Sequence, residues 1–255
     1  RLHAINSFDE ERTNKVLARL AENDTWQIPT TALLTGGINR LYEDDTWLKT
    51  FQYLPKKVKY LSFGNINMSE KRNRAVRLCR DKYIAFIDSD AVATSDWIEN
   101  GINLLKKNKK VAIVTGPDLP FPNQKGWSKI IGLAHKSFLL SGSKVFRKNI
   151  NKQVFCSQAS SCNMILIKKY FLKVKGMNEK IYIGEDIDLC DKIIKLKKIL
   201  YSPFVKIYHR SRDFIPFIFQ RYAYGTSIEH IFLRGVFINN IQYSVSFLIF
   251  MYFII

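Results

Sequence analysis

Apolar runs and amphipathic stretches alternate along the first half of the chain. The uninterrupted apolar run YIAFI (83–87) is typical of a strand that is covered on both faces, and VAIVTG (111–116) is a further expected strand. Apolar positions recur at helical spacing over 69–80 and over 94–107. The same alternation starts earlier, with strands expected at 1–5, 31–35 and 58–63 and a helix over 10–21. We therefore expect an α/β fold with a doubly wound, mostly parallel sheet of the Rossmann-like type.

The second half has a less regular pattern. Residues 117–127 contain three prolines, and residues 141–152 are basic and polar without clear periodicity. We expect both stretches to be loops, of the kind that cover a substrate in α/β enzymes. A strand over 163–169 and an amphipathic helix over 187–200 then follow.

The C-terminal stretch 241–255 is apolar except for Gln242, Ser244 and Ser246. Fifteen helical residues span about 22 Å, which is less than the roughly 30 Å of a bilayer core. We expect a truncated transmembrane helix or a helix that lies at a membrane interface, with a buried C-terminal helix as the alternative.

The charge balance is strongly basic. Forty Lys and Arg against 22 Asp and Glu give a formal net charge of +18, which suits phosphorylated small molecules, an anionic membrane surface or nucleic acid. No basic stretch is interleaved with aromatic residues, so we expect no nucleic-acid partner. The four cysteines form no C-x-x-C pair, which favours a reducing compartment over a disulfide scaffold.

Asp88 and Asp90 directly follow the apolar run 83–87. Open α/β sheets bind ligands at the carboxyl ends of their strands, and residues two apart in a strand share one side. Two neighbouring carboxylates repel each other unless a cation lies beside them, and Mg²⁺ or Mn²⁺ prefers such oxygen ligands. The pattern indicates a metal-diphosphate site, although two acids that cap a strand-to-helix turn would read the same way.

A second acidic cluster, GEDIDLCD, opens the helix expected from residue 187. Acids in a first helical turn interact favourably with the helix dipole, which accounts for part of the cluster. One carboxylate left unpaired in a dry cleft can act as a general base on a hydroxyl. We choose Asp186, although position alone does not separate it from Glu185.

His209 ends the strand-like run VKIYH, and Arg210 and Arg212 follow it. A single histidine is more often a structural residue, but beside a carboxylate-bound cation it can complete the coordination shell. The two arginines can hold phosphate oxygens or can be solvated surface charge.

In this order and spacing, these three motifs resemble the family 2 glycosyltransferases of the GT-A fold. The resemblance covers nearly the whole chain up to about residue 230. It rests on INSFDEER (5–12), EKRNRAVRLCRDKYIAFIDSDAV (70–92), SCNMILIKKYFLKVKGMNEK (161–180), GEDIDL (184–189) and FIFQRYAYG (217–225). Thr35, Gly36 and Gly37 stand where the family usually has an acidic pair, so the donor base is not predicted.

The resemblance implies roles for individual residues. Asp186 would be the catalytic base, and Asp88 and Asp90 would hold the nucleotide-sugar and a divalent cation, Mg²⁺ or Mn²⁺. His209 would be a further metal or diphosphate contact. The remaining implied contacts are Phe8 on the nucleotide base, Arg72 and Arg221 on the donor, and Glu185 and Gln220 on the acceptor side.

The expected protein is an inverting, hexosyltransferase-like enzyme of polysaccharide biosynthesis. It would move a sugar from a nucleotide-diphosphate donor to a hydroxyl of a glycan or lipid-linked acceptor at the cytoplasmic face of the cell membrane. Its catalytic domain would span 1–230, with a nucleotide-binding half over about 1–116, an acceptor-binding half over about 117–230, and a membrane-associated segment over 231–255.

Two alternatives use the same residues differently. In a phosphatase of the haloacid-dehalogenase class, Asp88 would attack phosphorus and Asp90 would serve as acid and base. That motif normally opens its domain, whereas three strand-helix units are expected before it here. In a non-catalytic binding module, the basic surface alone would account for the function.

Overall fold

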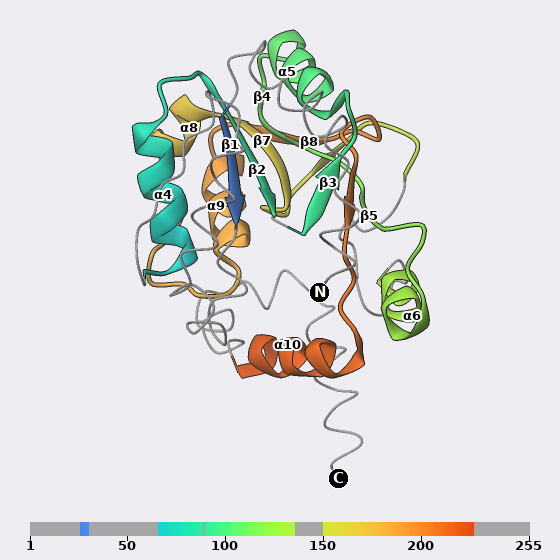
Figure 1. The fold of residues 1–255 in the computed structure, drawn as a ribbon. Coiled ribbons are helices and arrows are strands. Elements are labelled where there is room, and N and C mark those ends of the chain that lie inside the picture. Colours follow the sequence, from blue (N-terminus) through green and yellow to red (C-terminus); the bar gives the residue numbers. More distant parts are fainter. Residues whose placement is uncertain (1–25, 31–65, 89, 136–149, 227–255) are drawn as a thin grey trace, which may run out of the picture.

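The computed structural model describes residues 26–30, 66–88, 90–135 and 150–226, and Figure 1 shows their arrangement. A six-stranded sheet in the order β1-β2-β7-β4-β8-β6 forms its centre. The strands of this sheet are β1 (Trp26–Thr30), β2 (Tyr83–Asp88), β4 (Val111–Thr115), β6 (Val154–Cys156), β7 (Asn163–Ile167) and β8 (Lys198–Tyr201). The pairs β1–β2 and β4–β8 are parallel, while β7 runs antiparallel between β2 and β4, and β6 runs antiparallel at the edge.

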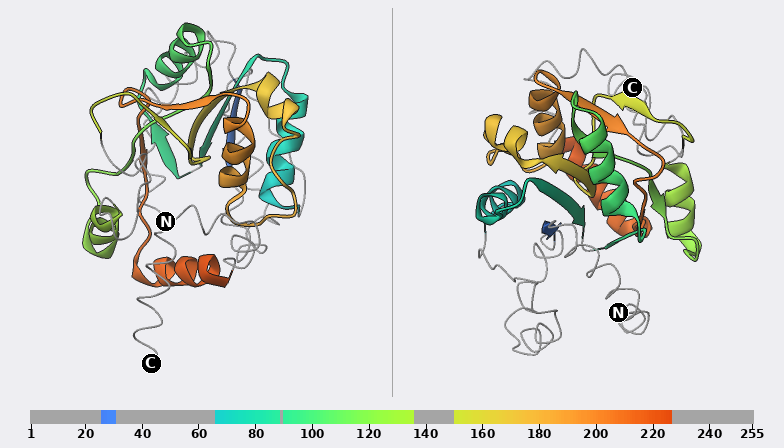
Figure 2. Two further views of the ribbon diagram at one scale, coloured as in Figure 1. Left: turned by 180° about the vertical axis from the view of Figure 1, so that it is seen from behind. Right: turned by 90° about the horizontal axis from the view of Figure 1, so that it is seen from above.

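Helices cover both faces of the sheet, as the two views in Figure 2 show. The described helices are α4 (Met68–Leu78), α5 (Trp97–Lys107), α6 (Gly126–Ala134), α8 (Lys168–Lys173), α9 (Glu185–Ile194) and α10 (Phe214–Thr226). Alternate residues of β2 enter different cores: Ala85 and Ile87 pack with α5, whereas Ile84 and Phe86 pack with α4, α8 and α9. The fold is therefore a three-layer α/β structure with a mixed sheet, in which β1, β2, β4 and β8 run in one direction and β6 and β7 in the other.

A smaller sheet extends from the carboxyl end of β2. It consists of β3 (Ala91–Ala93), β5 (Asp118–Pro120) and β9 (Ile207–His209), in the order β3-β9-β5. The chain crosses between the two sheets at Gly116, where a Cβ atom would lie only 1.9 Å from the carbonyl oxygen of Val205. A glycine permits this close backbone approach, which sets β5 beside β9.

Several expected elements are confirmed, with small differences in their ends. The apolar runs 83–87 and 111–116 are β2 and β4, and the helices expected over 69–80 and 94–107 are α4 and α5. Two expectations need correction. The proline-rich stretch 117–127 is not only loop, because it contains β5 and the start of α6. The helix expected over 187–200 ends at Ile194, and the apolar residues Ile199 and Leu200 belong to β8.

Other expectations lie outside the described residues. They are the strands at 1–5, 31–35 and 58–63, the helix over 10–21, most of the loop 141–152, and the apolar segment 231–255. Within the described ranges, none of the helices combines the length and the apolarity needed to cross a membrane.

Candidate active site

The candidate site lies where β2 ends and β9 passes beside it. Asp88 is the last residue of β2, and Asp90 precedes Ala91, which pairs with His209 of β9. A backbone hydrogen bond from Arg210 N–H to the Asp90 carbonyl, at 3.1 Å, fixes this approach. Ligand atoms of Asp88, Asp90 and His209 all lie within 4.8 Å of one another. Folding therefore brings together the three residues that the sequence suggests as metal ligands.

His209 lies between two carboxylates. Its Nε2 is 3.0 Å from Oδ1 of Asp90, and its Nδ1 is 3.5 Å from Oδ1 of Asp118. Burial lowers the pKa of His209, but hydrogen bonds to Asp118 and Asp90 outweigh it and raise this pKa to about 10. Burial raises the pKa of Asp90, but the contact with His209 outweighs it and holds that pKa below its ordinary value. In this state the imidazolium donates from both ring nitrogens.

Arg72 is buried between the two acidic motifs. Its Nη1 is 2.6 Å from Oε1 of Glu185, and its Nη2 is 3.8 Å from Oδ1 of Asp88. Desolvation and the charge of Asp186 raise the pKa of Glu185, against the opposing effect of Arg72. The same guanidinium thus contacts the end of β2 and the first turn of α9. Glu185, expected on the acceptor side, is an ion-pair partner of Arg72.

Asp186 lies in the first turn of α9, after Gly184, whose φ of 86° is in the left-handed region. Its Oδ2 accepts a hydrogen bond from Ser161 N–H at 3.3 Å, and its Oδ1 accepts from Ile187 N–H at 2.8 Å. The residue after Ser161 is Cys162, whose thiol donates to Asp118 at 3.6 Å. Asp186 is thus linked to the His209 cluster through two consecutive residues.

The remaining predicted site residues are Phe8, Gln220 and Arg221. Gln220 and Arg221 lie on α10, where Arg221 Nη2 donates to Gln220 Oε1 at 3.3 Å and the guanidinium lies over the ring of Phe217. A role for this pair at the donor diphosphate or the acceptor stays a prediction. Phe8 lies outside the described residues.

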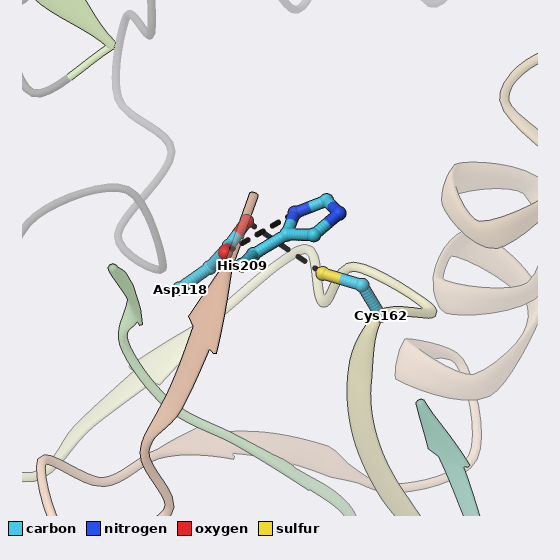
Figure 3. Close-up of side chains that lie close together, drawn as sticks. All are labelled: Asp118, Cys162 and His209. Atoms are coloured by element: carbon cyan, nitrogen blue, oxygen red, sulfur yellow. Dashed lines mark hydrogen bonds and ion pairs between the residues drawn. The ribbon is translucent and has the colours of Figure 1, made fainter. Parts of the chain in front are cut away.

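Two buried polar residues at the site, Asp118 and Asn163, were not singled out in the sequence. Asp118 is only 7% exposed and contacts His209 (Figure 3). Asn163, fully buried, accepts from the Trp97 indole N–H at 2.8 Å and donates to the carbonyls of Val205 and Pro117. A signal for Asp118 existed: between residues 97 and 185 the other acids are Glu99 and Glu179, and Asp118 lies two residues after the strand expected at 111–116.

The donor set fits a hard divalent cation. Carboxylate oxygens are preferred ligands of Mg²⁺ and Mn²⁺, and imidazole nitrogen is acceptable to Mn²⁺. Asp88 and Asp90 supply the oxygens at the carboxyl end of a strand, and His209 supplies the nitrogen from a neighbouring strand. Asp90 is half exposed, with 44% of its side chain accessible, so this side of the cluster is open to a ligand.

Comparison with known proteins agrees with this arrangement. Residues 42–171, just over half of the chain, match the family described as glycosyl transferase family 2. The chain therefore belongs to this family of glycosyltransferases. The assignment confirms the resemblance and favours the transferase interpretation over the phosphatase and the binding module.

One protein of similar sequence and one solved structure of similar fold can be compared with this chain. An uncharacterized glycosyltransferase of Methanocaldococcus jannaschii, MJ1057, is 26% identical over 145 residues, which are 55% of this chain and 46% of that protein. The crystal structure of GalNAc-T7 with UDP, GalNAc and Mn²⁺ has a similar fold, with a TM-score of 0.51 and 11% identity over 68% of this chain and 36% of that one. At that identity the likeness concerns the fold alone, which is of the GT-A type. The chain spans less than half the length of either protein.

Proposed function

We propose that this chain transfers a sugar from a nucleoside-diphosphate donor to a hydroxyl of a glycan or lipid-linked acceptor, with inversion at the anomeric carbon. The observation that carries this proposal is the convergence of Asp88, Asp90 and His209 at the end of β2. Arg72 forms ion pairs with both Asp88 and Glu185, and Asp186 follows Glu185 in the chain. A cation-binding group and a candidate base therefore share one end of the sheet.

Asp88, Asp90 and His209 would hold Mg²⁺ or Mn²⁺ together with the donor diphosphate. When bound, such a cation stabilises the negative charge that develops on the leaving diphosphate. Arg72 contributes a buried positive charge beside Asp88, which reduces the repulsion between this carboxylate and an approaching phosphate.

Asp186 would remove the proton from the acceptor hydroxyl as that oxygen attacks the anomeric carbon. The backbone N–H of Ser161 donates to its Oδ2, and its place in the first turn of α9 fixes where the carboxylate lies. The resulting carboxylic acid then releases the proton to solvent. Attack from the face opposite the leaving group gives inversion.

Calorimetric titration with a panel of nucleoside diphosphates tests the cation requirement. Binding should need Mg²⁺ or Mn²⁺, should disappear with a chelator, and should weaken at least tenfold in Asp90→Ala because one ligand is lost. Asp96→Ala, an exposed aspartate at the start of α5, is the matched control and should bind normally. Equal affinity with and without chelator would contradict the proposal.

We also propose that the protein works at an anionic lipid surface, the cytoplasmic face of the cell membrane. Helices α6 and α10 pack together, with the rings of Trp127 and Phe214 4.7 Å apart. Between 52% and 71% of each of six large apolar residues on this pair is exposed: Trp127, Ile130, Leu133, Ile215, Phe219 and Tyr222. Lys125 and Lys129 lie exposed beside them, and aromatic and basic side chains together suit an anionic interface. All four cysteines carry free thiols, which agrees with a reducing compartment.

Vesicle co-sedimentation tests the lipid surface. The protein should bind phosphatidylcholine vesicles that contain phosphatidylglycerol better than pure phosphatidylcholine vesicles. The double variant Trp127→Ser/Phe219→Ser should bind several-fold less, whereas Leu78→Ser, an exposed leucine on α4, should not change binding. Undiminished binding of the double variant would contradict this role for α6 and α10.

A further inference from the structure

Asp118 and His209 are brought together by the small sheet. Asp118 begins β5, in register with Ile207 of β9, while Pro120 is in register with His209. A backbone hydrogen bond from Ile207 N–H to the Pro117 carbonyl, at 3.0 Å, closes the ladder. Asp118 therefore lies on the strand next to the one that carries His209, and backbone hydrogen bonds hold the two strands together.

The Asp118 carboxylate is buried and has two polar neighbours that the structure describes. Its Oδ1 is 3.5 Å from Nδ1 of His209, and its Oδ2 accepts from the thiol of Cys162 at 3.6 Å. Figure 3 shows dashed contacts from the Asp118 carboxylate to one imidazole nitrogen and to the sulfur, with the other ring nitrogen on the far side of the ring. Asp118 and Cys162 are 7% and 3% exposed, so water does not compete freely for these contacts.

The two nitrogens of His209 have different surroundings. Nε2 lies on the open side with Asp90, and Nδ1 lies on the buried side with Asp118. An imidazole binds a cation only through a nitrogen that carries no proton, so the ring must keep its remaining proton on the other nitrogen. A carboxylate at Nδ1 favours that arrangement, because it accepts the Nδ1 proton and fixes the plane of the ring.

We infer that Asp118 is a positioning residue for the proposed cation site: it holds the proton of His209 on Nδ1 and thereby presents Nε2 to a divalent cation shared with Asp88 and Asp90. The inference rests on the proposed function, since it assigns a purpose to a ring that faces that site. Cys162 supports the arrangement by donating its S–H to the second carboxylate oxygen, which restricts rotation of the Asp118 side chain.

The position of Cys162 extends this network. The preceding residue, Ser161, donates its backbone N–H to Asp186, and the following residue, Asn163, donates to the carbonyl of Pro117, next to Asp118. Three consecutive residues thus contact the candidate base, the positioning carboxylate and the residue that precedes it in the chain. The cation side and the acceptor side of the site share one supporting segment.

Titration of the full chain with Mn²⁺ alone, followed by the electron paramagnetic resonance signal of free Mn²⁺, measures the effect on the site without turnover. Asp118→Ala should raise the dissociation constant for Mn²⁺ about 10- to 100-fold, as loss of an outer-shell partner of a ligating histidine does. Asp118→Asn should recover part of the affinity, because its amide oxygen still accepts the Nδ1 proton. Asp96→Asn should bind Mn²⁺ normally.

Nuclear magnetic resonance of ¹⁵N-histidine-labelled protein with Mg²⁺ tests the same point in the unmodified chain. The chain has four histidines, and the His209 signals are assigned with His209→Gln. With Mg²⁺ bound, Nδ1 of His209 should carry a proton and Nε2 should not. A protonated Nε2 with a bare Nδ1 would overturn the inference, even if every Asp118 variant failed to fold.

The outcomes separate the two proposals. If Asp90→Ala weakens Mn²⁺ binding and Asp118→Ala folds but binds Mn²⁺ like the unmodified chain, the role of Asp118 is wrong and the cation site stands. If neither Asp90→Ala nor His209→Ala changes Mn²⁺ affinity, the proposed cation site itself is wrong, and the inference about Asp118 is overturned with it.

Discussion

Arg72 and Glu185 form a largely buried ion pair, with Nη1 of the arginine 2.6 Å from Oε1 of the glutamate. The pair joins α4, which packs beside β2, to the first turn of α9, where Asp186 lies. Arg72 also faces Asp88 and lies over the ring of Phe86, 5.9 Å from its centroid. One side chain therefore sets the spacing between the two acidic motifs.

Replacement of Arg72 should destabilise the fold strongly. Arg72→Met leaves Glu185 buried without its partner, and breaking such a pair costs about 3–5 kcal/mol. Arg74→Met on the same helix is the matched control, because the Arg74–Glu70 pair is more exposed than the Arg72 pair and is worth less than about 1 kcal/mol. Urea unfolding measures the free energy of unfolding of both variants. Equal decreases would show that the buried Arg72 pair stabilises the fold no more than the Arg74 pair does.

Glu185 should make the stability of the protein depend on pH. Desolvation and the charge of Asp186 raise its pKa in the folded state above the ordinary 4.5. A carboxyl with a raised folded pKa favours folding below its unfolded pKa, and this contribution is lost as the pH rises through the folded value. The unmodified chain should therefore lose unfolding free energy relative to Glu185→Gln as the pH rises above 4.5.

Denaturant unfolding of both proteins over a pH series measures this difference. The Glu185→Gln variant keeps a neutral side chain beside Arg72 throughout, so its own curve should be flatter in the same range. A difference that stays constant with pH, or that changes in the opposite direction, would mean that Arg72 controls the ionisation of Glu185.

Asp186→Asn should separate chemistry from binding. Asparagine has nearly the same shape and its amide oxygen can still accept from Ser161 N–H, so the fold and nucleotide binding should persist. Turnover should fall about 10²–10⁴-fold, the usual contribution of a general base. Donor hydrolysis and transfer, with the donor found by mass-spectrometric screening of nucleotide-sugars, measure turnover, and calorimetry measures binding. Unchanged turnover would show that Asp186 is not the general base.

The parts of the fold that the sequence predicted are those with a strong local pattern. The stretches 83–87 and 111–114 are apolar at every position because both faces of β2 and β4 are covered by helices. The helices α4 and α5 were predicted by apolar positions at helical spacing, which form their buried faces. Asp88 and Asp90 could be singled out for the same reason, since two acids directly after a buried strand contrast with their surroundings.

The remainder depends on contacts between distant residues. The sequence indicates a strand over 163–169 but not that it runs antiparallel between β2 and β4, because direction is set by the chain path and not by composition. The strand β5 is only three residues long and ends in Pro120, and for this reason the sequence pattern predicted a loop there. Asp118 gained its candidate role only when β5 was placed beside β9.

Asn163, although uncharged, should contribute strongly to the stability of the fold. Asn163→Ala removes the acceptor of the Trp97 indole and the donor to the carbonyls of Val205 and Pro117, all in the interior. Each buried polar group left without a partner costs about 1–3 kcal/mol, so a loss of at least about 3 kcal/mol is expected. Trp97→Phe, the matched variant, loses the indole N–H and leaves the two carbonyl contacts in place.

The two variants should also differ in Mn²⁺ binding. Pro117 precedes Asp118, and Val205 lies two residues before the start of β9, so loss of the Asn163 amide frees both strands that orient His209. Asn163→Ala should therefore weaken Mn²⁺ binding at a temperature where it is still folded, whereas Trp97→Phe should not. Thermal unfolding and Mn²⁺ titration of the same samples measure both effects. Equal Mn²⁺ affinity in the two variants would show that the cation site does not depend on this amide, and that the small sheet alone holds His209 in place.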